Sequence, residues 1–379
     1  MMSDFRERHL DEILVCNRTR CGFCHEECPV YSEKRIESYS CRGRMQIAKG
    51  LIQGLYDPSP ALIDRLSACT LCGYCKSQCA LQTTEIIEDL RASLLESGTP
   101  PVARHGEIMR WVENEHNPYF EKHADRTRWL SFHHPLADRS DLLFFAGCTT
   151  SYRQPELNEA MLAVLESANV KVGYLGEDEW CCGSVLLRTG DRKGAVQLAQ
   201  HNVEALRAQG ARVVVTGCPG CYRTLKFDYP KLLGSTGLEV LHSSQLFSHL
   251  ISGNKIELKS DVVGSLTYHD PCHLGRHCGE YEAPRRVLKS IPGAEIVEMQ
   301  RTRENSWCCG AGGGLRSAFP DLSLRIAEKR VLEAAGTGAE CLVSACPFCR
   351  SNLKGAVDSL EMAESLMVLD LSELLAKVT

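Results

Sequence analysis

The sequence lacks long hydrophobic runs and any strong excess of charge. No apolar stretch approaches the roughly 20 residues that a membrane-spanning helix needs, and the first residues carry charges where a signal peptide has an apolar core. The 43 Lys and Arg residues against 48 Asp and Glu residues give a net charge of −5, which does not favour nucleic acid as a partner. These absences predict a cytoplasmic protein that inserts no segment into a membrane and reaches one only through a partner protein.

The chain also lacks a Gly-x-Gly-x-x-Gly fingerprint after a predicted strand. That fingerprint marks a dinucleotide-binding turn, so flavin or nicotinamide chemistry is expected on another polypeptide. The 379 residues, 44% of them hydrophobic, suffice for two or three domains with buried cores. A single small binding module is therefore excluded.

Cysteine, in contrast, is abundant, with 21 residues. The total is odd and the chain opens without a secretion signal, which favours metal ligands or catalytic thiols over structural disulfides. Most of the cysteines form four groups, at positions 16–28, 69–79, 148–221 and 272–349. The question is therefore which metal they bind and in what arrangement.

The last two groups belong to a tandem repeat. Cys218 and Cys221 lie 128 positions before Cys346 and Cys349, and the segments 211–219 and 339–347 also correspond. Short apolar runs alternate with helical periodicity in both copies, which predicts α/β modules with mostly parallel sheets and cysteines just after strand ends. The expected strands are 142–146, 213–216, 265–268 and 341–344, and the expected helices are 155–167, 192–208, 283–290 and 322–335.

The N-terminal hundred residues show no comparable strand runs and should be mainly helical, with a capped helix that begins at Thr83 and Thr84. The predicted fold is thus α+β and multidomain, with the two α/β modules related by pseudo-two-fold symmetry. Its parts are a helical, ferredoxin-like two-cluster domain (1–98), a linker strap (99–140), the first Cys-Cys-Gly module (141–257) and the second (258–379).

The strap contains four prolines, Trp111, Trp129 and several histidines. A metal-binding histidine tract is one interpretation, but the irregular spacing favours a surface strap packed by its aromatic residues. The five histidines are His105, His116, His123, His133 and His134.

Two cysteine motifs in the first hundred residues carry ferredoxin-like spacing. Cys69, Cys72, Cys75 and Cys79 have the spacing of half of a bacterial two-cluster ferredoxin, whereas a zinc knuckle would show two separated pairs. In the looser motif Cys16-x4-Cys21-x2-Cys24-x3-Cys28 the first gap is four residues instead of two. Because the fourth cysteine of each ferredoxin motif ligates the other cluster, the expected ligand sets are Cys16, Cys21, Cys24 and Cys79, and Cys28, Cys69, Cys72 and Cys75. Cys41 is the nearby substitute if Cys16 cannot reach, although an unligated thiol is the favoured interpretation.

Each C-terminal module has five cysteines in the order Cys, Cys-Cys-Gly, Cys-Pro-x-Cys. The sets are Cys148, Cys181, Cys182, Cys218 and Cys221, and Cys272, Cys308, Cys309, Cys346 and Cys349. Five ligands exceed what a tetrahedral zinc site uses, and a vicinal pair suits neighbouring irons of a polynuclear cluster. Gly183, Gly310 and Gly312 would let the backbone approach such a cluster closely.

With these motifs the chain resembles the iron-sulfur proteins of the heterodisulfide reductase D type, within the wider Cys-Cys-Gly domain family. The most specific stretches are 268–275, 307–314 and 346–349. The resemblance implies that each five-cysteine set holds a noncubane [4Fe-4S] cluster and forms a catalytic site, and that the two clusters flank and cleave the disulfide of coenzyme M and coenzyme B. Two cubane [4Fe-4S] clusters would feed the electrons in.

The expected partners are a redox protein, either a flavoprotein or a membrane b-type cytochrome, and a small disulfide or thiol substrate. One alternative is the iron-sulfur component of a flavin-linked 2-hydroxyacid or glycerol-3-phosphate dehydrogenase, or of a membrane sulfur-metabolism complex. A zinc-binding scaffold is the other alternative, and it predicts a colourless protein with about one zinc per four cysteines.

Other residues near the motifs have weaker assignments. His269, His273 and His277 surround Cys272 and are candidates for proton donors, although hydrogen-bonded scaffold is the favoured interpretation. Cys278 and Cys341 have no counterpart in the first module and are not expected to be ligands. Four arginines near the first motif would offset cluster charge or dock an acidic partner, with a solvated face slightly favoured: Arg18, Arg20, Arg42 and Arg44.

Overall fold

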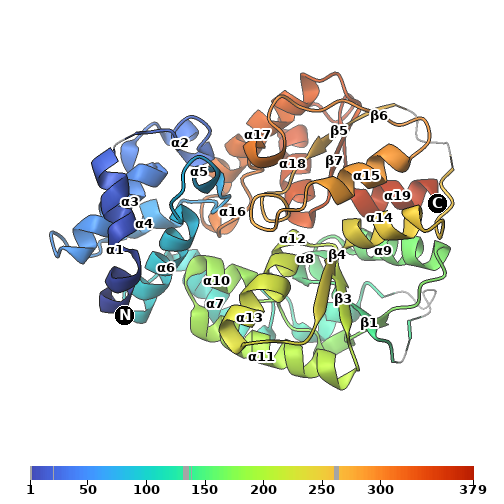
Figure 1. Ribbon diagram of the computed structural model, residues 1–379, viewed down its shortest axis with the longest axis horizontal. Helices are drawn as coiled ribbons and strands as arrows, with labels where there is room; N and C mark the ends of the chain where they lie inside the picture. The colour runs from blue at the N-terminus through green and yellow to red at the C-terminus, as the bar shows by residue number, and fades with distance from the viewer. Residues whose placement is uncertain (1, 20, 131–135, 138, 260–263) are drawn as a thin grey trace.

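The computed structural model describes residues 2–19, 21–130, 136–137, 139–259 and 264–379, so Arg20, His133 and His134 lie outside the described residues. The N-terminal region is helical, as predicted, and Figure 1 shows it beside the two α/β modules. Its elements are α1 (Met2–Thr19), α2 (Pro29–Lys34), η1 (Glu37–Tyr39), α3 (Cys41–Ile52), α4 (Pro60–Ser67), α5 (Tyr74–Ser77) and α6 (Thr83–Glu96).

Helix α6 begins where the sequence predicts, but its start is stabilised differently. Its apolar face, which includes Ile86, Leu90 and Leu94, is buried in the N-terminal core. The predicted hydroxyl cap is wrong, because the N-cap residue is Gln82 and its side chain makes no capping bond. The Thr83 hydroxyl donates to Cys75 Sγ at 3.1 Å instead. The start of α6 therefore supports the cysteine loop.

Two four-stranded parallel sheets follow, with the same strand order. The first sheet is β2-β1-β3-β4 and the second is β6-β5-β7-β8. Their strands are β1 (Leu142–Phe144), β2 (Gly173–Tyr174), β3 (Val213–Thr216), β4 (Glu239–His242), β5 (Ser265–His269), β6 (Glu295–Ile296), β7 (Cys341–Ser344) and β8 (Met367–Asp370). The predicted α/β modules with parallel sheets are confirmed, and the apolar central strands are buried because helices cover them on both faces.

The helices of each module surround its sheet. In the first they are α8 (Cys148–Tyr152), α9 (Pro155–Ser167), η3 (Gly176–Asp178), α10 (Ser184–Thr189), α11 (Arg192–Ala208), α12 (Pro219–Arg223), η4 (Thr224–Asp228), α13 (Tyr229–Leu233) and α14 (Ser243–Ser252). In the second they are α15 (Glu282–Ser290), η5 (Arg303–Asn305), α16 (Leu315–Ala318), α17 (Pro320–Ala335), α18 (Pro347–Ser359) and α19 (Leu371–Val378). Helix α9 packs against α19 and α14 against α15, so one apolar core continues through both modules.

The segment 99–140 is more than the expected surface strap. It forms α7 (Ala103–Glu115) and η2 (His123–Thr127). Trp111 packs against Phe120, as expected of a segment held by aromatic residues, while Trp129 is buried in the main core and Arg126 is fully buried. The segment therefore contributes to the interior of the first module.

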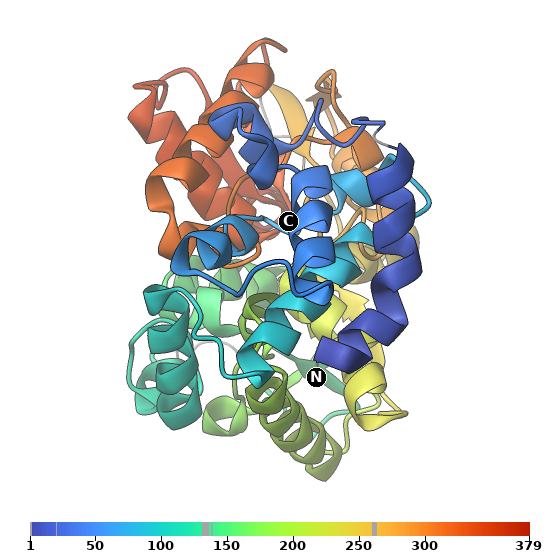
Figure 2. The same ribbon diagram turned by 90° about the vertical axis from the view of Figure 1, so that its left-hand side faces the viewer.

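The N-terminal helices lie across the junction between the two modules (Figure 2). Within the described part of the chain, no helix is both long and apolar enough to cross a membrane.

Candidate metal centres

The first and second ferredoxin-like motifs exchange their fourth cysteines. The thiol of Cys16 is affected electrostatically by Cys24, Cys79 and Cys21, and burial together with these neighbours raises its pKa to about 11. Cys28 has Cys69 and Cys72 as its neighbours, and burial raises its pKa to about 12. The structure thus brings each motif's last cysteine to the other motif, as the two-cluster pattern requires.

Cys41 lies between the two groups. It is 3% exposed at the start of α3, and its thiol is hydrogen bonded to both Cys24 and Cys75. The hydrogen bond from Cys41 lowers the pKa of Cys24 to about 6. Cys41 is therefore within reach of both sites, and the geometry keeps it as a candidate beside Cys16.

The five cysteines of the first module form one buried chain of contacts. Cys148 contacts Cys181, Cys182 contacts Cys221, and Cys221 contacts Cys218. These thiols come from the loops after β1, before α10 and after β3, which meet at one edge of the sheet. Hydrogen bonds from Cys181 and Cys221 lower the pKa of Cys182 to about 6.

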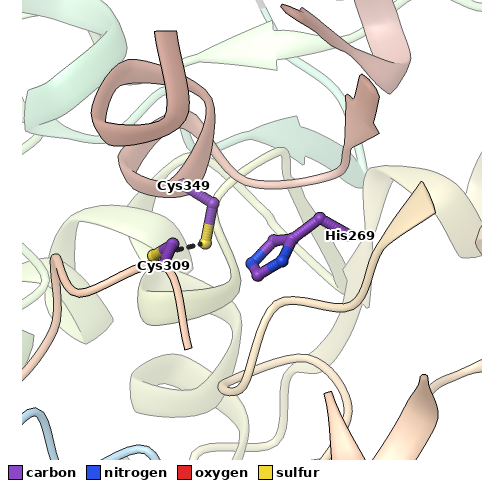
Figure 3. A group of neighbouring side chains, drawn as sticks. All are labelled: His269, Cys309 and Cys349. Carbon is purple, nitrogen blue, oxygen red and sulfur yellow. Dashed lines mark hydrogen bonds between the residues drawn. The ribbon is translucent and has the colours of Figure 1, made fainter. Parts of the chain in front are cut away.

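The second module repeats this arrangement. Cys308 contacts Cys272 and Cys309, and the sulfurs of Cys309 and Cys349 are 3.1 Å apart (Figure 3). The backbone N–H of Gly310 donates to Cys308 Sγ at 3.4 Å, as that of Gly183 does to Cys181 Sγ in the first module. Both glycines have positive φ, of 84° and 83°. Five converging thiols with backbone donors fit a polynuclear iron-sulfur cluster better than a single metal ion.

The second ferredoxin-like motif lies directly against the second module. The thiol of Cys72 is hydrogen bonded to Cys308. Gly313 approaches so closely that a Cβ atom there would be 2.2 Å from the carbonyl oxygen of Cys69, which explains the glycine. Arg276 donates to Cys72 O at 2.7 Å, and His277 bonds Leu71 O at 2.8 Å. The sequence gives no indication of this contact, because its partners are more than 200 positions apart.

Two families of cysteine-rich domains match this chain. A 4Fe-4S dicluster domain matches residues 14–83, and a cysteine-rich domain of the Cys-Cys-Gly type matches residues 142–226 and 266–354. The D-type component of the dihydromethanophenazine:CoB–CoM heterodisulfide reductase of Methanosarcina barkeri is 40% identical over 97% of this chain and 94% of its own length. The chain belongs to the heterodisulfide reductase D family.

Two less similar relatives are named for other activities. The B-type component of the CoM/CoB fumarate reductase of Methanothermobacter marburgensis is 30% identical over 94% of this chain and 70% of its own length. The EtfAB:quinone oxidoreductase of Syntrophomonas wolfei is 30% identical over 99% of this chain and 59% of its own length. As a member of the heterodisulfide reductase D family, the chain is an iron-sulfur component of an oxidoreductase and carries 4Fe-4S domains.

The three histidines of this heterodisulfide reductase-type motif have different surroundings. His277 serves as scaffold through its bond to Leu71 O. His273 is half-buried near Gly220 of the first module, and desolvation lowers its pKa. His269 lies next to Cys309 and Cys349, with all three donor atoms within 4.8 Å of one another.

Arg126 and Glu179, which belong to no cysteine motif, lie next to the thiol site of the first module. Arg126, from the strap, donates to Cys148 Sγ at 3.5 Å and pairs with Glu179, whose carboxylate accepts from the N–H groups of Ala146 and Gly147. No motif could reveal Arg126, because Cys148 is 22 positions away and Glu179 is 53.

The remaining cysteines, Cys278 and Cys341, lie apart from the converging thiols, and two of the arginines near the first motif have different surroundings. Cys341 lies in β7, and Cys278 has Arg223 and Asp228 as its main electrostatic neighbours, so both differ from the converging thiols. The interpretation of a solvated face is wrong for Arg44, which is 1% exposed and donates to Arg65 O and Ala68 O. Arg42 pairs with Glu37 at the surface.

Proposed function

We propose that the chain relays electrons through two cubane [4Fe-4S] clusters to two noncubane [4Fe-4S] clusters, where a disulfide such as a heterodisulfide is reduced or formed. The observation that carries this proposal is the convergence of five thiols in each module, all of them buried except the half-buried Cys272. The cubane ligands would be Cys16, Cys21, Cys24 and Cys79, and Cys28, Cys69, Cys72 and Cys75. The noncubane ligands and catalytic residues would be Cys148, Cys181, Cys182, Cys218 and Cys221, and Cys272, Cys308, Cys309, Cys346 and Cys349.

The contact between Cys72 and Cys308 supports an order in which electrons reach the two modules. It joins the second ferredoxin-like motif to the second module, so electrons would enter there before they reach the first module. The close backbone approach at Gly313 and the bond from Arg276 to Cys72 O keep this contact short.

The arrangement of the modules supports the disulfide chemistry. By the repeat, α9 corresponds to α15 and α14 to α19, and α9 packs on α19 while α14 packs on α15. These reciprocal contacts support the pseudo-two-fold relation between the modules. The boundaries proposed for the parts of the chain are 1–98, 99–140, 141–257 and 258–379. When bound, two similar clusters supply the two electrons that a disulfide needs, and the N–H groups of Gly183 and Gly310 donate to cysteine sulfurs beside them. A Cβ atom at Gly312 would lie 2.7 Å from the carbonyl oxygen of Thr70, so this glycine serves the contact with the second ferredoxin-like motif.

Substitution of one vicinal cysteine tests the proposal. Cys308→Ser, in protein purified anaerobically, should remove one noncubane EPR signal and lower the viologen-driven reduction of the CoM–CoB disulfide more than tenfold. Cys278→Ser is the matched control and should leave both unchanged. Undiminished signals and turnover in Cys308→Ser, or negligible acid-labile sulfide in the unmodified protein, would contradict the proposal.

A second candidate function is electron transfer from a flavoprotein without disulfide chemistry. The likeness to the EtfAB:quinone oxidoreductase and to the fumarate reductase component favours it. Purification from the native host separates the two, since a co-purifying flavin dehydrogenase supports this candidate and a b-type cytochrome supports a membrane-associated heterodisulfide route. The zinc scaffold predicts colourless material instead.

A further inference from the structure

The two five-cysteine sites differ in buried residues close to their cysteines, and the first difference lies at the end of β5. His269 ends β5 three residues before Cys272, and Phe145 occupies the matching position three residues before Cys148. Both side chains are buried, at 1% and 0% exposure. The second module thus has a polar ring where the first has a hydrocarbon ring, although the cysteines are the same.

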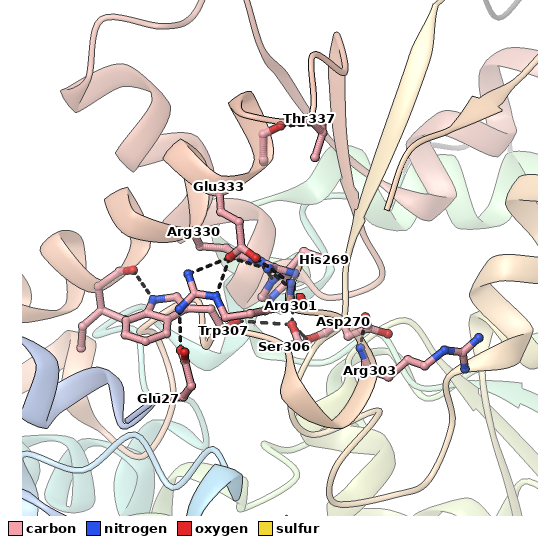
Figure 4. Close-up of polar contacts among 12 residues, drawn as sticks. Glu27, His269, Asp270, Arg301, Arg303, Ser306, Trp307, Arg330, Glu333 and Thr337 are labelled. Carbon is pink, nitrogen blue, oxygen red and sulfur yellow. Dashed lines mark hydrogen bonds and ion pairs between the residues drawn. The ribbon is translucent and has the colours of Figure 1, made fainter. Parts of the chain in front are cut away.

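One edge of the His269 ring is fixed by an arginine. Arg330, which is fully buried, donates from Nε to His269 Nδ1 at 3.1 Å (Figure 4). Arg330 is itself held by Arg301 O and by Glu333, both at 2.9 Å. At the matching position of the first module stands Asn202, which bonds Cys181 O and the Tyr229 hydroxyl. The polar pair of His269 and Arg330 is therefore specific to the second module.

The other edge of the ring faces the thiols. The His269 side chain is hydrogen bonded to Cys309, and the ring points toward the sulfurs of Cys309 and Cys349 (Figure 3). Because Nδ1 is bonded to Arg330, Nε2 is the ring nitrogen left for the Cys309 side of the thiol site.

The hydrogen bond from Arg330 determines which ring nitrogen of His269 carries the proton. A guanidinium carries only donors and stays protonated, so Nδ1 must offer its lone pair to Arg330. In the neutral imidazole the proton is then on Nε2, and a protonated nitrogen cannot ligate iron. Ligation through Nε2 would place the proton on Nδ1, opposite the Arg330 N–H, and would lose that buried hydrogen bond.

We propose that His269, oriented by Arg330, donates an Nε2–H hydrogen bond to the Cys309 side of the second noncubane cluster and raises its reduction potential above that of a site without this donor. The inference rests on the proposed function, which assigns a cluster to these cysteines. A donor to a cluster sulfur favours the reduced, more negative state, because it stabilises the added charge. His269 is a positioning and tuning residue in this scheme and not a ligand.

The decisive measurements use two variants of the complete chain, purified anaerobically and matched for iron and acid-labile sulfide. His269→Phe copies the first module's Phe145, and His269→Gln keeps an N–H donor. The noncubane signal that disappears in Cys308→Ser identifies the second module's cluster. In EPR-monitored redox titrations, His269→Phe should lower the midpoint of that signal only, and His269→Gln should shift it by less than half as much.

Proton ENDOR on the unmodified protein adds a test that no folding defect can confound. An exchangeable proton coupled to the second cluster, absent in His269→Phe, is the expected result. No exchangeable coupling, an unchanged midpoint in His269→Phe, or a directly bound histidine nitrogen would overturn the inference while leaving the proposed function intact. Absence of sulfide in the unmodified protein would instead overturn the proposed function.

Discussion

Arg91 connects all three parts of the chain, and its replacement tests how they are held together. The side chain is 6% exposed and donates to five carbonyl oxygens. Three belong to Leu66, Ser67 and Cys69 of the N-terminal region, at 2.6–3.0 Å, one to Arg188 of the first module at 2.6 Å, and one to Gly313 of the second at 2.9 Å. Burial lowers its pKa to about 10, so it remains charged at neutral pH.

Arg91→Met keeps much of the side-chain volume but leaves five buried acceptors without this donor. At about 1 kcal/mol for each hydrogen bond, the free energy of unfolding should fall by about 5 kcal/mol. That is a large part of the roughly 5–15 kcal/mol typical of folded proteins. Arg91→Lys retains the charge but has three donors, so about half of the loss is expected.

Anaerobic urea denaturation, followed by circular dichroism and by cluster absorbance, measures the effect. The control is Arg104→Met, which removes an exposed ion pair with Glu107 and a contact with the Phe120 ring and should cost about 1 kcal/mol. If Arg91→Met were no more destabilising than Arg104→Met, the carbonyl contacts would not hold the three parts together.

Substitutions at three other places test separate features of the structure. Gly313→Ala should destabilise the chain by about 2 kcal/mol more than Gly338→Ala, because both glycines have positive φ but only Gly313 faces a backbone oxygen, and thermal unfolding of the two variants checks this. Cys16→Ser should remove one cubane EPR signal and Cys41→Ser should retain both, and the reverse result would assign Cys41 as the ligand. Burial lowers the pKa of His105 to about 4 against about 6.5 in the unfolded chain, so its folded form resists protonation and stability should fall by about 2 kcal/mol from pH 7 to pH 5. His105→Gln should remove this part of the pH dependence in urea titrations, and an unchanged slope would refute it.

The central part of the fold could be predicted because its signals are local. Strand β3 is an apolar run, and α9 and α11 begin and end where the periodicity does. The edge strands β2 and β6 are only two residues long, which is too short for a recognisable hydrophobic periodicity. Helix α7 was missed because its buried stripe consists only of His105, Ile108 and Val112.

The candidate ligands of the ferredoxin-like motifs lie close together in the sequence, whereas those of each module come from separate loops that a parallel sheet brings to one edge. Their surroundings could not be predicted, because Arg126, Arg91 and Arg330 act on groups far away in the sequence. A lone arginine in a helix is usually at the surface, and only tertiary structure distinguishes these buried ones.

The two modules place different hydrogen-bond donors beside their cysteine sulfurs. Each places a fully buried arginine, paired with a glutamate, behind its cysteines: Arg126 with Glu179, and Arg330 with Glu333. The pairing lets a donor enter the interior without adding net charge. In the first module the guanidinium reaches Cys148 Sγ directly, whereas in the second an imidazole stands between the arginine and the sulfurs. A charged donor acts on a sulfur more strongly than a neutral one, so two sites with the same candidate ligands are placed in different electrostatic fields. The cysteines that the two modules share would therefore determine what the sites bind, and the residues that differ between the modules determine the electrostatic difference between the sites.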